Sequence, residues 1–115
     1  MQLKDLTLPV EKLEAEQIQV LNELEHLRRL ARAEIDPDVG EGDPKLVERD
    51  LTMSLIRVQE QKLADIQQAL RGLREGTYGI CEHCGQPIDP QRLEALPETT
   101  LCLNCKTILE RRGHF

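Results

Sequence analysis

The sequence predicts a mainly α-helical fold: a long antiparallel helical hairpin, then a four-cysteine zinc finger and a short final helix. Three observations predict it. Apolar side chains recur at spacings of three and four over two long segments, four cysteines form two C-x2-C pairs, and the only aromatic residues are Tyr78 and Phe115. A chain of 115 residues with so few rings cannot bury a thick core, so a bound metal is expected to stabilise it.

The first helix is predicted from Thr7 to about Arg32. Residues at alternating spacings of four and three form one stripe, which is typical of a coiled-coil seam. The stripe consists of Leu6, Val10, Leu13, Gln17, Val20, Leu24, Leu27 and Ala31. Pro9 is tolerated in a first turn, and the arginines near the end of the segment suit the negative end of the helix dipole.

The second helix is predicted from Asp43-Pro44, an N-cap followed by proline at the first helical position, to about Glu75. Gly76 is expected to end it, and Gly72 is a weak position within it because glycine is a poor helix former. The seam continues through Ile56, Gln59, Leu63, Ile66, Leu70 and Leu73. About 32 residues of helix would span roughly 48 Å.

The stretch DPDVGEGDP, residues 36–44, carries four acids, no base and two prolines, and so holds −4 of the net charge of −6. Its prolines and glycines favour a chain reversal, so the two helices are expected to fold back on each other as a hairpin. Pairing of the same stripes between two chains is the alternative. We therefore expect the hairpin in residues 1–76, its acidic tip loop in 36–43, and the finger with the final helix in 77–115.

Cys81, Cys84, Cys102 and Cys105 have the C-x2-C…C-x2-C spacing of a four-thiolate zinc site. Two residues between thiols allow one tight turn to direct both sulfurs at the same ion, and Gly85 eases the backbone at such a turn. Four thiolates leave no open coordination position, so one structural Zn²⁺ is predicted.

Two other interpretations of the cysteines are paired disulfides and a redox-active C-x-x-C, but a reducing compartment favours metal ligation. His83 lies inside the first pair and could compete as a ligand, although the four cysteines already complete the shell. His26 and His114 are expected on a helix surface and at a terminus.

The composition also excludes several classes of function. No apolar run has membrane-spanning length and the first residues lack the apolar core of a signal peptide, so a cytoplasmic protein is expected. An acidic chain almost without aromatics is a poor binder of nucleic acid. No nucleophile–base pair or phosphate-binding loop is present, and a hairpin has no deep cleft, so no enzymatic activity is expected.

Residues 76–106, GTYGICEHCGQPIDPQRLEALPETTLCLNCK, resemble the finger of the DksA/TraR family of bacterial transcription regulators. The similarity includes the residues leading into Cys81, the glycine after Cys84, the Pro87-Ile88 step, the stretch Arg92 to Ala95, and Lys106 after the last cysteine. The helix before the finger is compatible, so the resemblance covers about residues 37–106.

The resemblance implies a cytoplasmic protein whose hairpin enters the secondary channel of RNA polymerase, so that its acidic tip approaches the Mg²⁺-bearing active centre and alters initiation. The family's tip motif, Asp-x-x-Asp-x-Ala, falls on residues 38–43 when counted back without gaps from Cys81. Asp38 matches the first acid, Glu41 replaces the second, and Asp43 replaces the alanine. Asp38 and Glu41 are therefore the candidate working acids, and Asp43 is better explained as an N-cap.

The resemblance also bears on the alarmone ppGpp. Basic residues that the best-known members place on the long helix fall here on Val58 and Asp65, while Lys106 is retained. A tetraphosphate needs concentrated positive charge, so weak or absent ppGpp dependence is expected. Arg92 and Lys106 are candidate contacts for polymerase or ppGpp.

A monomer is expected from the hairpin. Two other functions stay open: a zinc-ribbon adaptor that binds other proteins, and a channel-binding competitor without an effect at the active centre. Light scattering would separate a monomeric hairpin from an adaptor with a dimerising stalk.

Overall fold

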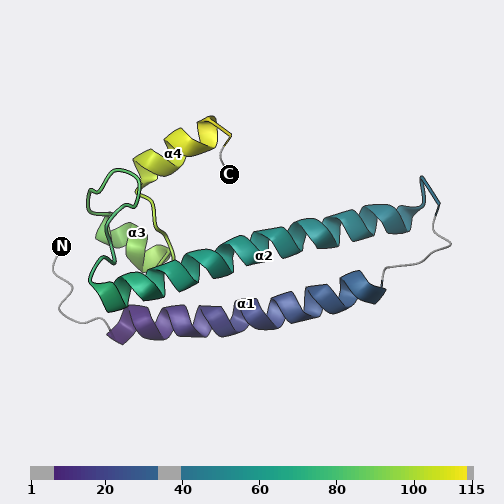
Figure 1. Ribbon diagram of the computed structural model, residues 1–115, viewed down its shortest axis with the longest axis horizontal. Coiled ribbons are helices and arrows are strands. Elements are labelled where there is room, and N and C mark those ends of the chain that lie inside the picture. The colour runs from purple at the N-terminus through teal and green to yellow at the C-terminus, as the bar shows by residue number, and fades with distance from the viewer. Residues whose placement is uncertain (1–6, 34–39, 114–115) are drawn as a thin grey trace.

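The computed structural model describes residues 7–33 and 40–113. Its elements in chain order are α1 (Thr7–Ala33), α2 (Pro44–Glu75), α3 (Pro90–Ala95) and α4 (Leu103–Arg111). α1 and α2 lie side by side and antiparallel, and α3 and α4 lie at the end of the hairpin where α2 finishes (Figure 1). The predicted helical hairpin with a C-terminal finger is therefore confirmed, in a molecule 58 Å long.

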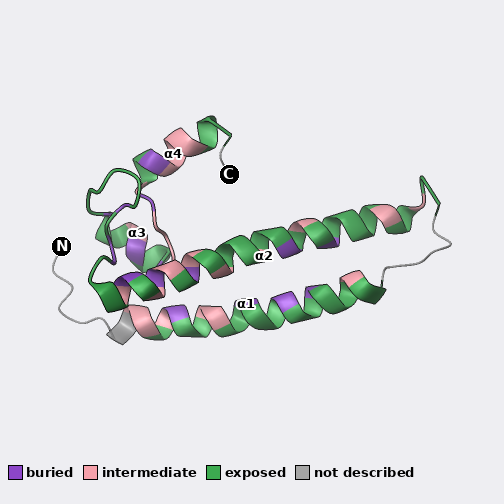
Figure 2. Cartoon of the chain, viewed as in Figure 1, coloured by how far each residue is buried: buried purple, intermediate pink, exposed green. Residues whose placement is uncertain are grey.

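The seam between α1 and α2 is built from the predicted stripe. Its buried members on α1 are Leu13, Val20, Leu24 and Leu27, and those on α2 are Ile56 and Ile66. The predicted Leu63, Leu70 and Leu73 are partly buried against them, and Ala69, which the predicted stripe did not include, is buried as well. Buried positions lie along the facing sides of the two helices, and exposed positions cover the outer sides (Figure 2). Gln17, the one polar residue in the α1 stripe, is half-buried at the edge of this seam. The two apolar stripes thus cover each other within one chain.

Both ends of α2 are fixed by the predicted residues. Asp43 is the N-cap, and its Oδ1 accepts a hydrogen bond from the Lys45 N–H at 2.9 Å, while Pro44 is the first helical residue. At the other end Gly76 has φ 80°, the left-handed conformation, and its N–H returns to the Gly72 carbonyl. Only glycine adopts this conformation without strain, so the helix ends where the sequence predicts.

The junction between α2 and the finger is a close backbone contact. A Cβ built on Gly72 would lie 3.3 Å from the Tyr78 backbone nitrogen and 3.3 Å from the Thr77 Oγ1. The Tyr78 N–H also donates to the Gly72 carbonyl at 3.1 Å, and the Tyr78 hydroxyl donates to the Pro97 carbonyl at 3.2 Å. The finger is therefore fastened directly to the last turn of α2.

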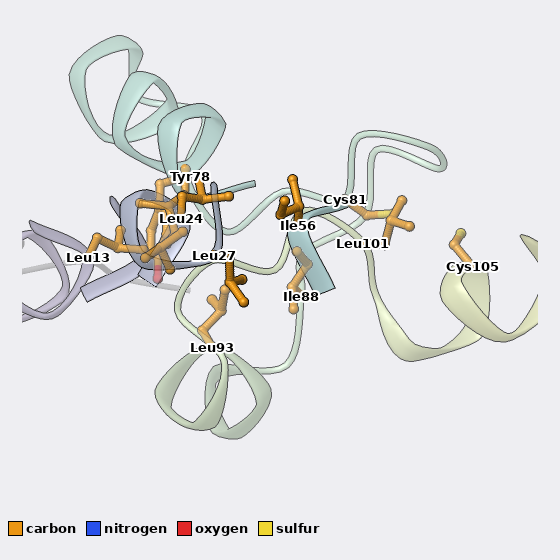
Figure 3. Packing of buried hydrophobic residues seen from close by; sticks show 13 residues of the cluster. Leu13, Leu24, Leu27, Ile56, Tyr78, Cys81, Ile88, Leu93, Leu101 and Cys105 are labelled. Carbon is orange, nitrogen blue, oxygen red and sulfur yellow. The ribbon is translucent and has the colours of Figure 1, made fainter. Parts of the chain in front are cut away.

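Apolar side chains from the finger continue the hairpin core. Tyr78, Ile88, Leu93 and Leu101 are each no more than 8% exposed and belong to the same cluster as the seam residues (Figure 3). The sequence analysis did not predict α3, which carries Leu93 into this cluster. The proposed division of the chain at residue 76 remains a prediction.

Candidate metal centre and hairpin tip

The four cysteines come together at the base of the molecule. One potential ligand atom from each of Cys81, Cys84, Cys102 and Cys105 lies within 4.8 Å of every other. Two of the sulfurs, those of Cys84 and Cys102, are 3.9 Å apart. Sulfurs at the corners of a tetrahedron around zinc, with Zn–S bonds of about 2.3 Å, are separated by about 3.8 Å. The cluster therefore fits a single tetrahedral zinc ion.

Local backbone structure places each sulfur. The Gly85 N–H donates to the Cys81 carbonyl at 2.9 Å, closing the first knuckle, and Gly85 has the left-handed φ of 77° that this turn requires. The second knuckle begins α4: Cys102 is its N-cap, and its sulfur accepts the Cys105 N–H at 3.4 Å. A C-x2-C pair thus acts as a metal knuckle and a helix start at once.

The electrostatics of the four sulfurs call for a cation. Burial acts to raise the pKa of Cys81, but backbone N–H groups of Cys102, Cys84 and His83 lower it to about 6. Burial and the neighbouring sulfurs of Cys102 and Cys84 raise the pKa of Cys105. One thiolate is therefore easily formed, and further negative charge in the cluster needs a positive ion to balance it.

The structure favours neither paired disulfides nor a histidine ligand. All four cysteines are free, and a disulfide requires sulfurs about 2.05 Å apart. His83 is exposed and is not part of the cluster, and His26 is exposed on α1, as expected. His114 lies outside the described residues. With four sulfur ligands and no open position, the zinc supplies structure rather than catalysis.

The hairpin tip lies at the opposite end of α2 from the zinc centre (Figure 1). Glu41 is exposed in a turn closed by the Asp43 N–H and the Gly40 carbonyl at 3.2 Å. Gly42 has the left-handed φ of 87° that this turn needs. Asp43 serves as the N-cap, as predicted. Asp38, the other candidate working acid, lies outside the described residues.

The two basic candidates occupy different positions. Arg92 on α3 is half-buried, and its Nε donates to the Leu101 carbonyl at 3.3 Å, so it ties α3 to the following loop. Lys106 on α4 is half-buried beside a cavity of about 310 Å³ that also meets Asp65 on α2. Burial raises the pKa of Asp65 and Lys106 opposes that shift.

Three further acids reach the same cavity: Glu82, Glu98 and Glu110. The sequence analysis missed them, because residues from α2, the finger and α4 are brought together only by the tertiary fold. Four acids against one lysine make this cavity predominantly negative.

These features define the class of protein: a C4 zinc-finger protein whose finger is mounted at the base of a long antiparallel helical hairpin. Residues 76–111 match the family described as prokaryotic dksA/traR C4-type zinc finger. A solution structure of a DnaK suppressor protein from Agrobacterium tumefaciens C58 is 31% identical, with a TM-score of 0.53, over 87% of this chain and 93% of that one. The chain belongs to the DksA/TraR C4-type zinc-finger family.

Two other relatives have functional names. The transcription factor DksA2 from Pseudomonas aeruginosa is 26% identical with a TM-score of 0.70, over 91% of this chain and 82% of that one. The RNA polymerase-binding transcription factor DksA from Caulobacter vibrioides is 33% identical over 87 residues, which is 76% of this chain and 60% of that protein.

The chain spans between 27% and 60% of the length of the first curated relatives that it matches. The Pseudomonas and Caulobacter relatives are both named as transcription factors. Within the part of the chain that the structure describes, no helix combines the length and apolar character that a membrane span requires.

Proposed function

We propose that this protein binds RNA polymerase and regulates transcription initiation. The observation that carries the proposal is the separation of two parts along the hairpin: a four-cysteine finger at one end and an exposed acidic turn at the other, in a molecule 58 Å long. Family membership and the name of the Caulobacter relative support polymerase as the partner.

In this mechanism the hairpin enters the secondary channel with its tip foremost and the finger stays outside. Glu41 and Asp38 are the acids that reach toward the Mg²⁺-bearing active centre. Within the described part of the chain, Glu41 makes no hydrogen bond or ion pair and is exposed. Asp43 is committed to the N-cap of α2. Glu41 therefore has no structural role, and it lies at the position that the resemblance aligns with an acid of the family's tip motif.

The response to ppGpp is proposed to be weak or absent. The cavity beside Lys106 contains Asp65, Glu82, Glu98 and Glu110, and a highly charged anion would be repelled by these carboxylates. Arg92 is engaged with the Leu101 carbonyl, which reduces its availability to a ligand. Both basic residues remain candidate contacts for polymerase.

We propose further that the protein acts as a monomer in the cytoplasm and without contacting nucleic acid directly. The monomer is supported by the seam, because α1 and α2 of one chain already cover each other's apolar stripes. The net charge of −6 opposes binding to a phosphate backbone.

The test combines co-purification with core polymerase and an in-vitro initiation assay on several promoters, with and without ppGpp. Asp38→Asn/Glu41→Gln is compared with the control Glu11→Gln/Glu75→Gln, which removes two exposed charges at the other end of the hairpin. Only the tip variant should lose its effect on initiation. Binding should change by less than about fivefold in both, because an exposed charge pair contributes at most about 1 kcal/mol.

Three outcomes distinguish the regulator, the adaptor and the channel-binding competitor. If the wild-type protein does not bind polymerase, the proposed function is wrong and the adaptor interpretation is favoured. If it binds without any effect on initiation, it is a channel-binding competitor. If the tip variant acts like wild type, the role of the tip acids is wrong.

A further inference from the structure

Two carboxyl groups from distant parts of the chain meet between the hairpin and the finger. Glu16 lies on α1, and Glu98 lies in the loop that joins α3 to α4. Their side chains are within hydrogen-bonding reach of each other. In each residue the Oε2 atom is shielded from solvent and has no hydrogen-bond partner among the described residues.

Two ionised carboxylates cannot satisfy each other, because both are acceptors without a donor. Buried acceptors without a partner, and two like charges side by side, both destabilise the fold. One proton shared between the groups removes both problems: it supplies an O–H donor and leaves a single negative charge. The arrangement is that of a carboxyl–carboxylate pair.

The surroundings contain both signs of charge. Lys12 on α1 and Lys62 on α2 favour the ionised form of Glu16. The opposing effects are larger: burial, and then Glu98, raise the pKa of Glu16. On the finger side Tyr78 faces the pair, and its own pKa is raised by burial and by both glutamates.

Glu98 also borders the acidic cavity, where it meets charged groups from three parts of the fold. These are Asp65 on α2, Glu82 in the finger, and Lys106 and Glu110 on α4. The acids outnumber the lysine, so the charge on this side of the pair is predominantly negative.

The positions of Glu16 and Glu98 allow the pair to connect two parts of the fold. Glu16 is one turn from Leu13, which is fully buried in the seam, and Glu98 follows Pro97, whose carbonyl accepts the Tyr78 hydroxyl. The pair therefore joins α1 to the same loop that Tyr78 holds from the end of α2.

We propose that Glu16 and Glu98 form a proton-operated latch that fastens the 96–101 loop of the finger to α1. In the closed form one O–H···O bond joins the two groups. In the open form that bond breaks, the proton passes to water and two carboxylates remain, which repel each other. No other group is oxidised, reduced or transferred, and the latch does not depend on the proposed binding to polymerase.

The direction of the pH effect follows from the raised pKa of Glu16. The folded state holds this proton more tightly than the unfolded chain does, so the contribution is present below the raised pKa and is lost as pH rises through it. Each unit by which the folded pKa exceeds the unfolded one changes the balance between closed and open latch about tenfold.

The first experiment is a carbon-13 NMR titration of the glutamate carboxyl groups in the zinc-bound wild-type protein. The proposal expects Glu16 to titrate above the ordinary glutamate value of about 4.3. If Glu16 follows an ordinary single-site curve at that value, no proton is shared and the proposal is overturned.

The second experiment measures hydrogen exchange of the amides in residues 96–101 over a pH range that begins at the ordinary glutamate pKa of about 4.3 and extends to about 8. Glu98→Gln supplies a permanent amide donor to Glu16, so it should keep the latch closed at every pH, and Glu16→Gln should do the same from α1. Relative to wild type, both variants should protect the loop more strongly as pH rises. The control Glu14→Gln removes an exposed carboxyl from the same helix. At each pH its loop amides should exchange at the same rate as those of the wild-type protein.

Exchange rates of each variant and of the wild-type protein are compared at the same pH. This comparison cancels the pH dependence of intrinsic amide exchange and of the zinc thiolates, because all the proteins share it. Protection that changes in parallel with wild type in both glutamine variants would overturn the latch.

Discussion

The seam between α1 and α2 can be tested by truncating Leu24, which is 1% exposed and faces α2. Leu24→Ala removes buried carbons and leaves a cavity, because the two long helices cannot close it without shifting along their length. Such truncations cost about 2–5 kcal/mol. Small domains are stable by only about 5–15 kcal/mol, so a large part of the stability would be lost. For a domain of this size the melting temperature should fall by roughly 8–20 °C.

The assay is circular dichroism of the zinc-bound protein during urea and thermal unfolding, at several protein concentrations. The control is Ile18→Ala on the same helix, where the side chain is 61% exposed. We expect a change of about 0.5 kcal/mol or less there, since alanine is also the better helix former. Equal losses in both variants would refute the seam as described. A wild-type midpoint that rises with concentration would mean that the stripes pair between chains.

The remaining predictions concern the zinc centre and the start of α2. Chelation of zinc, or Cys105→Ser, should unfold the finger and change the fluorescence of Tyr78, the only tyrosine of a chain without tryptophan, while most of the helical signal is kept. The affinity of the metal-free protein for zinc, measured by competition with a chromogenic chelator, should fall as pH decreases through about 6, because without metal the pKa of Cys81 is about 6 and the thiolate that binds zinc is lost below that value; an affinity independent of pH would contradict this. Asp43→Ala should lower the free energy of unfolding in urea by about 1 kcal/mol through loss of the cap, whereas Glu41→Ala should change it by less than about 0.5 kcal/mol.

The features that the sequence predicted well are those with local physical causes. The second helix was placed at Pro44–Glu75, as observed, because Asp43-Pro44 and Gly76 act on their own backbone. In a single chain with a short connection, the two apolar stripes can cover each other only if the helices pair antiparallel. The four cysteines were identifiable as a zinc site because their spacing reflects the geometry of the knuckles.

α3 was missed although its signal was present. Asp89-Pro90 repeats the Asp43-Pro44 signature, and the Asp89 Oδ1 accepts the Gln91 N–H at 2.9 Å just as Asp43 caps α2. A helix of six residues is too short to show a periodic apolar pattern, so only the cap could have revealed it.

Other features depend on tertiary contacts that no local pattern encodes. Gly72 was interpreted as a weak position in α2, but the structure shows a close approach of the Tyr78 backbone that a larger residue would disturb. No local pattern in the sequence distinguishes Glu16 and Glu98 from the other acids, and only the fold brings them together.

In the proposed mechanism Asp43 has a structural role at the acidic tip and Glu41 a functional one, and this difference allows a last prediction. The turn of residues 40–43 and the Asp43 cap hold the backbone of Glu41 in a fixed relation to the axis of α2. Glu41→Asp introduces the acid that the resemblance aligns with this position. It therefore draws the carboxylate back by about one C–C bond, or about 1.5 Å, without moving the backbone. Displacements of this size beside a catalytic centre can change rates about a hundredfold.

The variant should keep the stability of the wild-type protein and its affinity for polymerase, and change its effect on open-complex lifetime. A matched Glu11→Asp change at the exposed base of the hairpin should alter none of these. If Glu41→Asp and wild type give the same open-complex lifetimes while both bind polymerase, the position of this carboxylate does not control initiation, and the effect of the hairpin must come from occupying the channel.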